Sequence, residues 1–590
     1  MQWQSKSLEL NAILFLGAAL LFGCGRNESE PRTGDRYDYL IRGATVVDGS
    51  GAPPFQADVA IAGDRIAAVG DLNAAQADII IDATGKLVVP GFIDLHSHAD
   101  DQQGDWRGMR SPDSQRRAAP AFVSQGITTS VTNPDGLSPN MPLAEQIASV
   151  EARPFALNLA YMSAHARIRF AVLGEDSARP ATSREVALMQ EVLKSDMEAG
   201  AWGLATVLEM RDGHWSTTEE LIGLTSALKR FDGAFIAHPR SQSHRPGWWL
   251  PSLHAKRSTD YPWAPSMFEA SKELITIAET NGIRVSISHI SMRGPDPDQD
   301  VIRTIDAVNE ARERGVDIYA DMHVYKANEI GTFGGLMPFW AVATGKPSPT
   351  FHIRPSQPQR VFDYLTPLRD TLADPEKEER LRQDVEYLIA FRGGPYEIFI
   401  TEHPNNEWIG KSLAKLADQY GLTAVDMAIK IALEGDSQYV GGSRAYGNFR
   451  SEENIALFVK NEWVAGDTDG YTTRPGDPGY MSPRFYGAYP AWLKTYVIDR
   501  ELVSLEFAIR SFTGLAAEIL GISDRGVIRS GLAADLSIID LGKVAPQSTF
   551  YDFHAFSTGF DYVFINGTPV VAEAELTWAL PGRVLRKPHN

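Results

Sequence analysis

Polar and apolar positions follow two different patterns along the 590-residue chain. Near both ends, over residues 37–90 and 531–590, short apolar runs close on Gly, Asp or Asn, which is typical of strands joined by tight turns. Each end segment leaves strand edges that need cover, so we expect the two to fold together into one small β-sandwich. Between them, over residues 91–530, apolar strand candidates alternate with amphipathic helices. This alternation predicts an α/β fold in which parallel βα units close into a (β/α)8 barrel of the TIM type.

One long insertion interrupts the predicted barrel at about residues 338–462. Residues 372–391 have the pattern of a charged amphipathic helix, and residues 410–435 that of two helices broken at Gly421. We expect the insertion to form a lid or small subdomain over the active site. A passive helical elaboration of the barrel is the alternative.

Composition excludes several kinds of function. A formal net charge of −19 leaves no basic surface for phosphate contacts, so we do not expect the chain to bind nucleic acid. The single cysteine excludes a disulfide framework within the chain and metal sites built from several thiolates. Any metal must therefore be held mainly by histidines and carboxylates.

The N-terminal 24 residues have the features of an export signal. Lys6 precedes an apolar stretch over residues 12–22, which is too short to span a bilayer comfortably. The stretch ends in LFGC, which resembles the lipobox of bacterial lipoproteins, and residues 25–36 form a polar linker. We therefore expect a lipid-anchored protein of the bacterial envelope, facing the periplasm, with the lipid on Cys24. An ordinary cleaved signal peptide with an incidental cysteine is the alternative.

The stretch GFIDLHSHAD, residues 91–100, ends a short apolar run with two histidines. Because side chains at i and i+2 of a strand point the same way, His96 and His98 can bind one cation where the strand stops. Imidazole nitrogen suits zinc and its neighbours. A pair of ordinary surface histidines is the alternative interpretation.

Further candidate metal ligands follow other apolar runs of the predicted barrel. His238 ends GAFIAH, His289 follows GIRVSIS, and Glu209 ends GAWGLATVLE. Asp467 and Asp469 lie in DTDG, directly after another apolar run. Barrel enzymes carry their chemistry at the carboxyl ends of the strands, so we expect these side chains to meet the two histidines of HSH there.

Together these motifs resemble the amidohydrolase superfamily, and within it the N-acyl-D-amino-acid deacylase (D-aminoacylase) family. The resemblance extends from about Tyr37 to Arg586. It rests on VVPGFIDLHSHAD, STTEELIGL followed by GAFIAHPR, VSISHIS, DTDG, SPRFYGAYPAWL and PGRVLR. It implies a barrel with its β-sandwich, metal-dependent hydrolysis of a linear amide, and one or two zinc ions per chain.

The resemblance also implies roles for individual residues. His96, His98 and Asp469 would hold one ion, and His238 and His289 a second. Asp469 would in addition be the general base, taking a proton from the attacking water and passing it to the leaving amine.

The ligand that bridges the two ions stays open at this point. Deacylases of this family carry a cysteine in a GNCG-like turn after the second strand, whereas this chain has TNPDG with Asp135. The fourth strand supplies Glu209 in place of the lysine that other superfamily members carboxylate. Because a carboxylate bridges with its two oxygens, we predict Glu209 as the bridging ligand and keep Asp135 as the alternative.

Three further residues are predicted to contact the substrate. Arg484, in SPRFYG, would bind a substrate carboxylate with its fork of donors. Tyr325 resembles a family tyrosine of the pocket. His165 resembles a family position at a third-strand end, where a contact with the site and a structural role fit equally. The family's lysine two residues after the sixth-strand histidine is replaced by Ser291, with Arg293 close by.

The predicted reaction is metal-dependent hydrolysis of N-acyl-D-amino acids to a carboxylate and a free D-amino acid. The expected partner is this small molecule, and membrane contact is expected only through Cys24. One alternative is an amidohydrolase of a cyclic amide, of the hydantoin or dihydropyrimidine type, or of an unusual dipeptide. The other is a non-enzymatic lipoprotein that binds a ligand on an inactive barrel.

Overall fold

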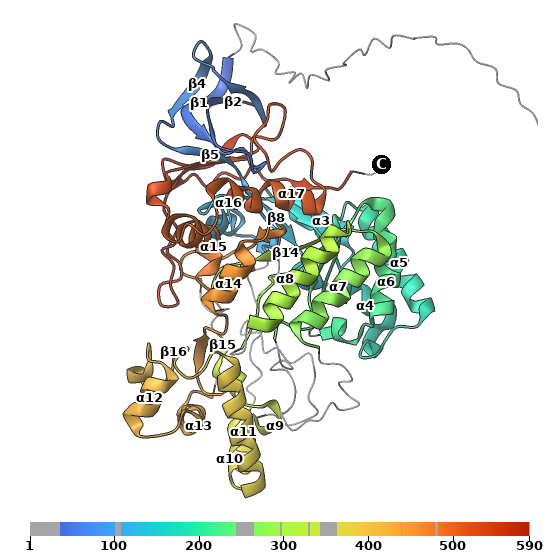
Figure 1. Ribbon diagram of the computed structural model, residues 1–590, viewed down its shortest axis with the longest axis vertical. Coiled ribbons are helices and arrows are strands. Elements are labelled where there is room, and N and C mark those ends of the chain that lie inside the picture. The colour runs from blue at the N-terminus through green and yellow to red at the C-terminus, as the bar shows by residue number, and fades with distance from the viewer. Residues whose placement is uncertain are drawn as a thin grey trace, which may run out of the picture.

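The computed structural model describes residues 36–100, 108–209, 211–243, 265–294, 298–327, 331–342, 363–437, 439, 441–477 and 482–588. Cys24 and the predicted export signal lie outside these residues. Within them, no helix combines the length and apolarity needed to cross a bilayer. Three parts follow one another along the long axis of the molecule, with a β domain at one end, a barrel in the middle and an insertion at the other end (Figure 1).

Parallel strands form the centre of the molecule, and buried side chains line all of them. They form two sheets, in the orders β24-β9-β8-β6 and β10-β11-β12-β13-β14-β18. The strands of these sheets are β6 (Phe92–Asp94), β8 (Ile127–Thr132), β9 (Asn158–Tyr161), β10 (Ser163–Ala164), β11 (Gly203–Val207), β12 (Ala234–His238), β13 (Val285–Ile287), β14 (Ile318–Met322), β18 (Val464–Gly466) and β24 (Val584–Leu585). Only Met162 separates β9 from β10, so the two sheets form one continuous arc.

The first and last strands of this arc meet just beyond their carboxyl ends. β7 (Ser97–His98) pairs in parallel with β19 (Gly470–Tyr471). The Asp469 N–H also donates to the His96 carbonyl oxygen at 2.9 Å. This contact joins the two ends of the arc and agrees with the predicted barrel.

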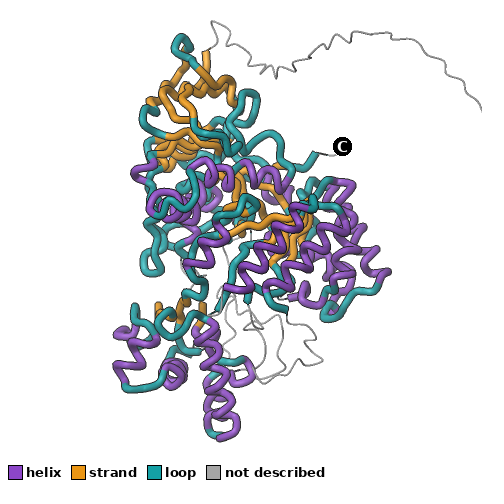
Figure 2. Tube along the Cα trace, viewed as in Figure 1, coloured by secondary structure: helices purple, strands orange, loops and turns teal. Residues whose placement is uncertain are grey.

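Helices surround the barrel strands, as the sequence pattern predicts (Figure 2). The helices between consecutive strands are α1 (Ser114–Arg117), α2 (Pro120–Val123), α3 (Leu143–Glu151), α4 (His165–Leu173), α5 (Ser183–Glu198), α6 (Thr218–Thr225), α7 (Met267–Asn281), α8 (Asp298–Glu313) and α14 (Glu452–Val459). Those after the last barrel strand are α15 (Arg484–Trp492), α16 (Leu505–Phe512) and α17 (Gly514–Leu520). α7 begins with a capping box, in which Ser266 and Glu269 exchange bonds with each other's backbone.

Strands from both chain ends share one nine-stranded sheet, as expected from their unprotected edges. Its strands are β1 (Arg36–Val46), β2 (Phe55–Ala62), β3 (Arg65–Gly70), β4 (Gln76–Asp82), β5 (Leu87–Pro90), β20 (Leu536–Ile539), β21 (Phe560–Ile565), β22 (Thr568–Ala572) and β23 (Glu575–Leu576). The two ends join where β5 pairs antiparallel with β20. Because β5 leads directly into β6, this sheet holds the entry to the first barrel strand.

The insertion has a hydrophobic core of its own. Its helices are α9 (Phe339–Val342), α10 (Leu365–Leu372), α11 (Pro375–Phe391), α12 (Leu413–Tyr420) and α13 (Ala424–Glu434). They pack with a three-stranded sheet of β15 (Gly331–Thr332), β16 (Ile398–Glu402) and β17 (Arg444–Gly447). The predicted break at Gly421 is confirmed, because this glycine ends α12 in the left-handed conformation with φ +64°.

Candidate active site

Four histidines predicted from the sequence meet at the carboxyl ends of the barrel strands. His98 ends β7 and His238 ends β12, whereas His96 and His289 follow β6 and β13 by two residues. The rings of His96 and His289 lie 4.6 Å apart, and those of His238 and His289 lie 4.5 Å apart, centre to centre. All four side chains are buried. Buried clusters of four imidazoles are rare in protein cores. Their shared position therefore indicates a common ligand.

Three of these imidazoles are oriented in the same way. One ring nitrogen lies against a partner within the protein and the other faces the shared centre. His96 Nδ1 lies 3.1 Å from Ser288 Oγ, and His289 Nδ1 lies 2.6 Å from Gln242 Nε2. Such a partner on the far nitrogen fixes the ring of a metal-binding histidine.

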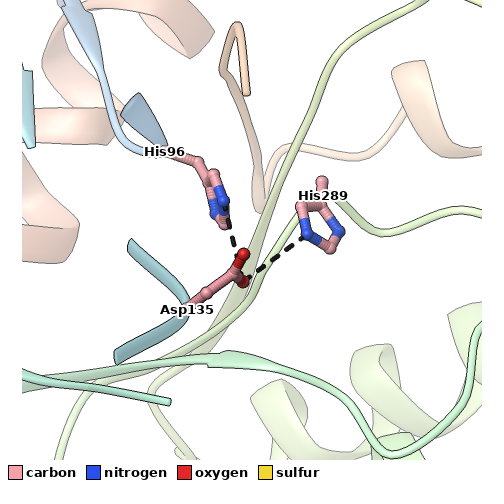
Figure 3. A group of neighbouring side chains, drawn as sticks. All are labelled: His96, Asp135 and His289. Atoms are coloured by element: carbon pink, nitrogen blue, oxygen red, sulfur yellow. Dashed lines mark ion pairs between the residues drawn. The ribbon is translucent and has the colours of Figure 1, made fainter. Parts of the chain in front are cut away.

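Asp135 is the carboxylate at the centre of the imidazoles. Its Oδ1 lies 3.5 Å from His238 Nδ1, 3.8 Å from His96 Nε2 and 3.9 Å from His289 Nε2. Its Oδ2 lies 3.9 Å from His98 Nε2. Figure 3 shows Asp135 between His96 and His289, with its carboxylate paired to both rings. One carboxylate thus reaches all four histidines.

Asp469 lies on the side of His96 and His98. Its Oδ1 is 3.1 Å from His98 Nε2 and 3.7 Å from His96 Nε2. Its Oδ2 accepts a hydrogen bond from Arg484 Nη2 at 2.8 Å. The ring of Tyr471 stacks on His98 with centres 4.5 Å apart, which holds that imidazole in place.

The donor set fits a metal ion. Two groups bring their ligand atoms within 4.8 Å of one another, namely His96, Asp135 and His289, and His96, His98 and Asp469. His96 Nε2, Asp135 Oδ1 and His238 Nδ1 are buried, and none of them makes a hydrogen bond with a described residue. Buried polar atoms without partners are costly, and here they converge on one place. Imidazoles with carboxylates are the ligand chemistry of zinc.

Glu209, which we predicted as the bridging ligand, lies elsewhere. Its Oε2 is 2.8 Å from His238 Nε2 and 3.2 Å from Arg293 Nη1. It therefore belongs to neither group of candidate ligands. The ion pair with Arg293 keeps Glu209 behind His238, so that the other nitrogen of His238 faces Asp135. The geometry favours Asp135, the alternative ligand, and the identity of the bridging carboxylate stays a prediction.

The backbone at the site is held in unusual conformations. Asp135, His289 and Asp469 have positive φ angles of 57°, 33° and 43°. This region costs free energy for residues other than glycine, and it occurs where the surrounding fold demands it. At Gly136, φ is +63° and an added Cβ would lie 2.3 Å from the Ala205 carbonyl oxygen. The turn that carries Asp135 therefore sits directly against β11 and requires glycine after the aspartate.

Electrostatics keep both central carboxylates ionised. Burial alone would raise their pKa values, but it is outweighed in each case. The pKa of Asp135 lies well below its usual range because of His96, His238 and His289. The pKa of Asp469 lies well below its usual range because of Arg484, His98 and His96.

The pKa values of His289 and His238 are shifted in opposite directions, although the two rings are neighbours. Burial lowers the pKa of His289 well below its usual value, with the neighbouring His238 and His96 acting in the same direction. For His238 burial is outweighed by Asp135 and Glu209, one on each ring nitrogen, and its pKa rises to about 9. A cation on Nδ1 would take the place of the proton that faces Asp135, while Nε2 keeps its contact with Glu209.

A second set of carboxylates lies on or directly after the barrel strands and supports the site. Burial raises the pKa of Asp94 to about 7, although Thr468 donates hydrogen bonds to it. Asp321 accepts from the His289 N–H at 2.7 Å and from Ser286 Oγ at 2.8 Å, and burial raises its pKa as well. The pKa of Asp467 is raised well above its usual value by burial and then by Asp321.

The three predicted substrate-binding residues take different places. Arg484 is buried, and its Nε and Nη2 donate to the backbone oxygens of Thr468 and Asp469 as well as to the Asp469 carboxylate. Tyr325 donates its hydroxyl to the Gly487 carbonyl oxygen at 3.4 Å. His165 Nδ1 lies 2.7 Å from Thr206 Oγ1, and no hydrogen bond or ion pair joins it to the described metal-binding groups.

Two residues of the site carried no signal that distinguished them in the sequence. Ser288 precedes the sixth-strand histidine and supports His96. Arg450 lies in a loop before α14 and reaches His323, with its Nη1 2.7 Å from His323 Nε2. Both contacts join segments more than a hundred residues apart, so only the fold reveals them.

Comparison with known proteins agrees with this geometry. Residues 80–233 match the model of the amidohydrolase family. An N-acyl-D-glutamate deacylase of Alcaligenes xylosoxydans xylosoxydans is 27% identical over 564 residues, which cover 94% of this chain and 97% of that protein. The chain thus carries an amidohydrolase family domain and is similar to N-acyl-D-amino-acid deacylases over most of its length. This confirms the resemblance noted in its motifs.

Solved structures of similar proteins share its fold. A D-aminoacylase, studied for the role of its binuclear metal centre, aligns with a TM-score of 0.66 and 26% identity, covering 93% of this chain and all of that one. The N-acyl-D-glutamate deacylase of Bordetella bronchiseptica, complexed with zinc and a phosphonate inhibitor, aligns with a TM-score of 0.68 and 24% identity. It covers 94% of this chain and all of the other. These likenesses confirm the barrel fold class.

Proposed function

We propose that the protein is a metal-dependent deacylase that hydrolyses N-acyl-D-amino acids to a carboxylate and a free D-amino acid. The observation that carries the proposal is the convergence of four oriented histidines on two ionised aspartates at the carboxyl ends of the barrel strands. The relatives support it further, because proteins named N-acyl-D-glutamate deacylase and D-aminoacylase align with this chain over nearly its whole length.

Zinc is the ion that we propose for the site. His96, His98 and Asp469 would hold one ion, and His238 and His289 the second, with Asp135 shared between them. Zinc bound there supplies a nucleophile at neutral pH, because it lowers the pKa of water to near 7, and it polarises the amide carbonyl.

The residues of this chain then have separate tasks. Asp469 is ionised and has one oxygen toward the histidines, so it accepts the proton of the attacking water and delivers it to the leaving nitrogen. Arg484 binds the other oxygen and the backbone of Asp469, and thereby fixes the direction of that carboxylate. Glu209 and Ser288 hold the rings of His238 and His96. A protonated leaving amine is what makes cleavage of the C–N bond feasible.

The direct test is turnover by the purified, zinc-loaded protein. N-acetyl derivatives of D-amino acids are compared with their L enantiomers, with hydantoin and with dipeptides. We expect release of free D-amino acid and much slower reaction of the others. The matched control is Asp469→Asn with its zinc content measured. Turnover of hydantoin or a dipeptide in preference to the N-acetyl D-amino acids would replace the proposal with the cyclic-amide or dipeptide alternative.

We also propose that the protein is anchored in the bacterial envelope by lipid on Cys24. The support is the sequence LFGC after a short apolar stretch, followed by a polar linker. Cell fractionation of the full chain and of Cys24→Ala tests this. We expect the wild-type protein in the membrane fraction and the variant in the soluble fraction of the envelope, and the same fraction for both would contradict it.

A further inference from the structure

The buried side of α3 carries one amide among apolar side chains. Leu143, Ile147 and Val150 are apolar, whereas Gln146 is a glutamine with only 1% of its surface exposed. A polar side chain in this place costs free energy unless its donors and its acceptor are engaged. The hydrogen-bond partners of Gln146 therefore indicate its role.

The Gln146 side chain bonds two other segments of the chain at once. Its Nε2 donates to Asp100 Oδ2 at 2.9 Å and to Asn133 Oδ1 at 2.9 Å. Its Oε1 accepts from Asn133 Nδ2 at 3.1 Å, so the two amides face each other as a closed pair. All three side chains are buried. A buried polar network whose members are all bonded in this way is rigid.

Each partner of Gln146 lies two residues from a candidate metal ligand. Asp100 follows His98 in HSHAD, and Asn133 precedes Asp135 in TNPDG. The first segment follows β6 and the second follows β8. Gln146 thus connects the segment that carries His98 with the turn that carries Asp135.

The turn needs this support because its backbone conformation is unfavourable. Asn133 and Asp135 have φ angles of 60° and 57°, in the left-handed region that residues other than glycine rarely adopt. Gly136 packs against β11 on one side of the turn. On the other side, the Asn133 amide bonds Gln146 and donates to the Met162 carbonyl oxygen at 3.0 Å. The position of the Asp135 carboxylate therefore depends on these contacts.

The other partner, Asp100, is held independently of Gln146. Its Oδ1 accepts from Arg110 Nε at 3.0 Å, and its Oδ2 also accepts from the Tyr161 hydroxyl at 2.9 Å. Arg110 Nη2 donates in addition to the Asp100 carbonyl oxygen at 2.8 Å. Asp100 is thus a fixed point, and loss of Gln146 would release the turn at Asn133 and leave the segment after His98 in place.

We propose that Gln146 is a positioning residue of the metal site and acts through Asp135. It holds the turn over residues 133–135 in its left-handed form and at a fixed place relative to His98, so that the carboxylate meets the imidazoles. This inference rests on the metal site of the proposed function. It extends that site to a helix whose amide bonds Asp100 and Asn133.

The first test is the zinc affinity of Gln146→Met, which keeps the length of the side chain and removes its donors and acceptor. We expect the affinity to fall about 10- to 100-fold, the usual loss when the support of a metal ligand is removed. Titration against a competing chelator measures it. The visible absorption of the cobalt-loaded protein, which depends on ligand geometry, should change as well.

Asn158→Leu is the matched control, because Asn158 is also a buried amide bonded to one aspartate and one asparagine. Its Nδ2 donates to Asp535 Oδ2 at 3.0 Å, and its Oδ1 accepts from Asn566 Nδ2 at 2.8 Å. Asn158 begins β9 and so lies at the end of the strands opposite to the candidate site. Asn158→Leu should lower the melting temperature and leave the zinc affinity and the cobalt spectrum unchanged.

A double variant tests whether Gln146 acts through Asp135. Two residues that act through one another give losses that do not add, whereas independent losses add. Zinc affinity of Asp135→Asn combined with Gln146→Met should therefore lie within about threefold of that of Asp135→Asn alone. Full addition of the two losses would overturn the inference.

An unchanged zinc affinity in Gln146→Met would also overturn the inference, while the deacylase activity of the wild-type protein stands. If the wild-type protein binds zinc but does not hydrolyse N-acetyl D-amino acids, the proposed function fails, and the affinity comparison still decides on Gln146. A wild-type protein that binds no zinc overturns both. Should Gln146→Met not fold, Gln146→Glu decides by the same titration, because it keeps an acceptor for Asn133 and removes both donors.

Discussion

Two sets of aspartates at the same barrel mouth have pKa values shifted in opposite directions. Asp135 and Asp469, in the turns after the strands, face imidazoles and an arginine, and their pKa values are low. Asp94, Asp321 and Asp467, on or directly after strands, face hydroxyls, backbone N–H groups and one another, and their pKa values are high. Asp94, Asp321 and Asp467 are fully buried, whereas Asp135 and Asp469 keep 16% and 14% of their side-chain surface exposed. Asp135 and Asp469 also have cationic partners, and both differences mark which carboxylates can take part in chemistry.

The largest expected effect compares one aspartate of each set. Asp469→Asn should lower kcat by about 10³-fold, because the ionised carboxylate that moves the proton is lost. Asp467→Asn should stay within about tenfold of the wild-type rate, because burial and Asp321 raise the pKa of Asp467 and an amide resembles the uncharged form that they favour. Steady-state kinetics at fixed zinc content measures both. Equal losses would mean that the two charge states do not govern the reaction.

The next largest effect is on zinc affinity. It compares Asp135, a candidate ligand, with Glu209, which contacts the ligand His238. Asp135→Asn should weaken zinc binding by more than about 100-fold, whereas Glu209→Gln, which alters only the partner of His238, should cost about 10- to 100-fold. Titration against a competing chelator gives both affinities. A larger loss for Glu209→Gln would restore the bridging role that the sequence first suggested for it.

Removal of the metal tests whether Asp135, Asp469 and the histidines form a metal site that stabilises the fold. At 100 times its dissociation constant, zinc should stabilise the protein by about 2.7 kcal/mol, seen as a higher melting temperature than after chelation. The increment should shrink in Asp135→Asn and persist in Asp467→Asn. A melting temperature indifferent to zinc in the wild-type protein would show that the imidazoles and carboxylates do not form a metal site.

The smallest effect concerns the backbone that presents Asp135. Gly136→Ala should cost about 1–3 kcal/mol and weaken zinc binding, because the left-handed turn is strained and the methyl group meets the Ala205 carbonyl oxygen. Gly421→Ala is the control. It shares the positive φ, at +64°, but has open space around it, so it should cost about 1 kcal/mol and leave zinc affinity unchanged. Denaturant unfolding and zinc titration compare the two variants.

The barrel and its histidines could be predicted because they leave local signals. His238 and His289 each follow an apolar run, and the period of side chains along a strand places His96 and His98 on one side. The ends of the chain could be joined because strand edges need partners. Gly421 marked a helix end by its conformational freedom, as the structure confirms.

The bridging carboxylate and the arginines could not be assigned in the same way. Asp135 is favoured over Glu209 by the contact with Arg293, which lies 84 residues beyond Glu209 and holds it on the far side of His238. Arg484 looked like a substrate clamp in its motif, but the structure shows it bound to Asp469. Spacing in the sequence indicates which side chains reach the mouth of the barrel. It does not show which partner each of them takes.

The short pairing of β7 with β19 has a consequence for how the protein comes into being. Residues 97–98 and 470–471 leave the ribosome far apart in time, yet their pairing brings His98 beside Asp469. Nascent or truncated chains that stop before residue 470 lack this seam and one of the two ligand groups. The group of His96, His98 and Asp469 is thus completed only after residue 469 has been synthesised, and we expect fragments of the N-terminal half to lack it.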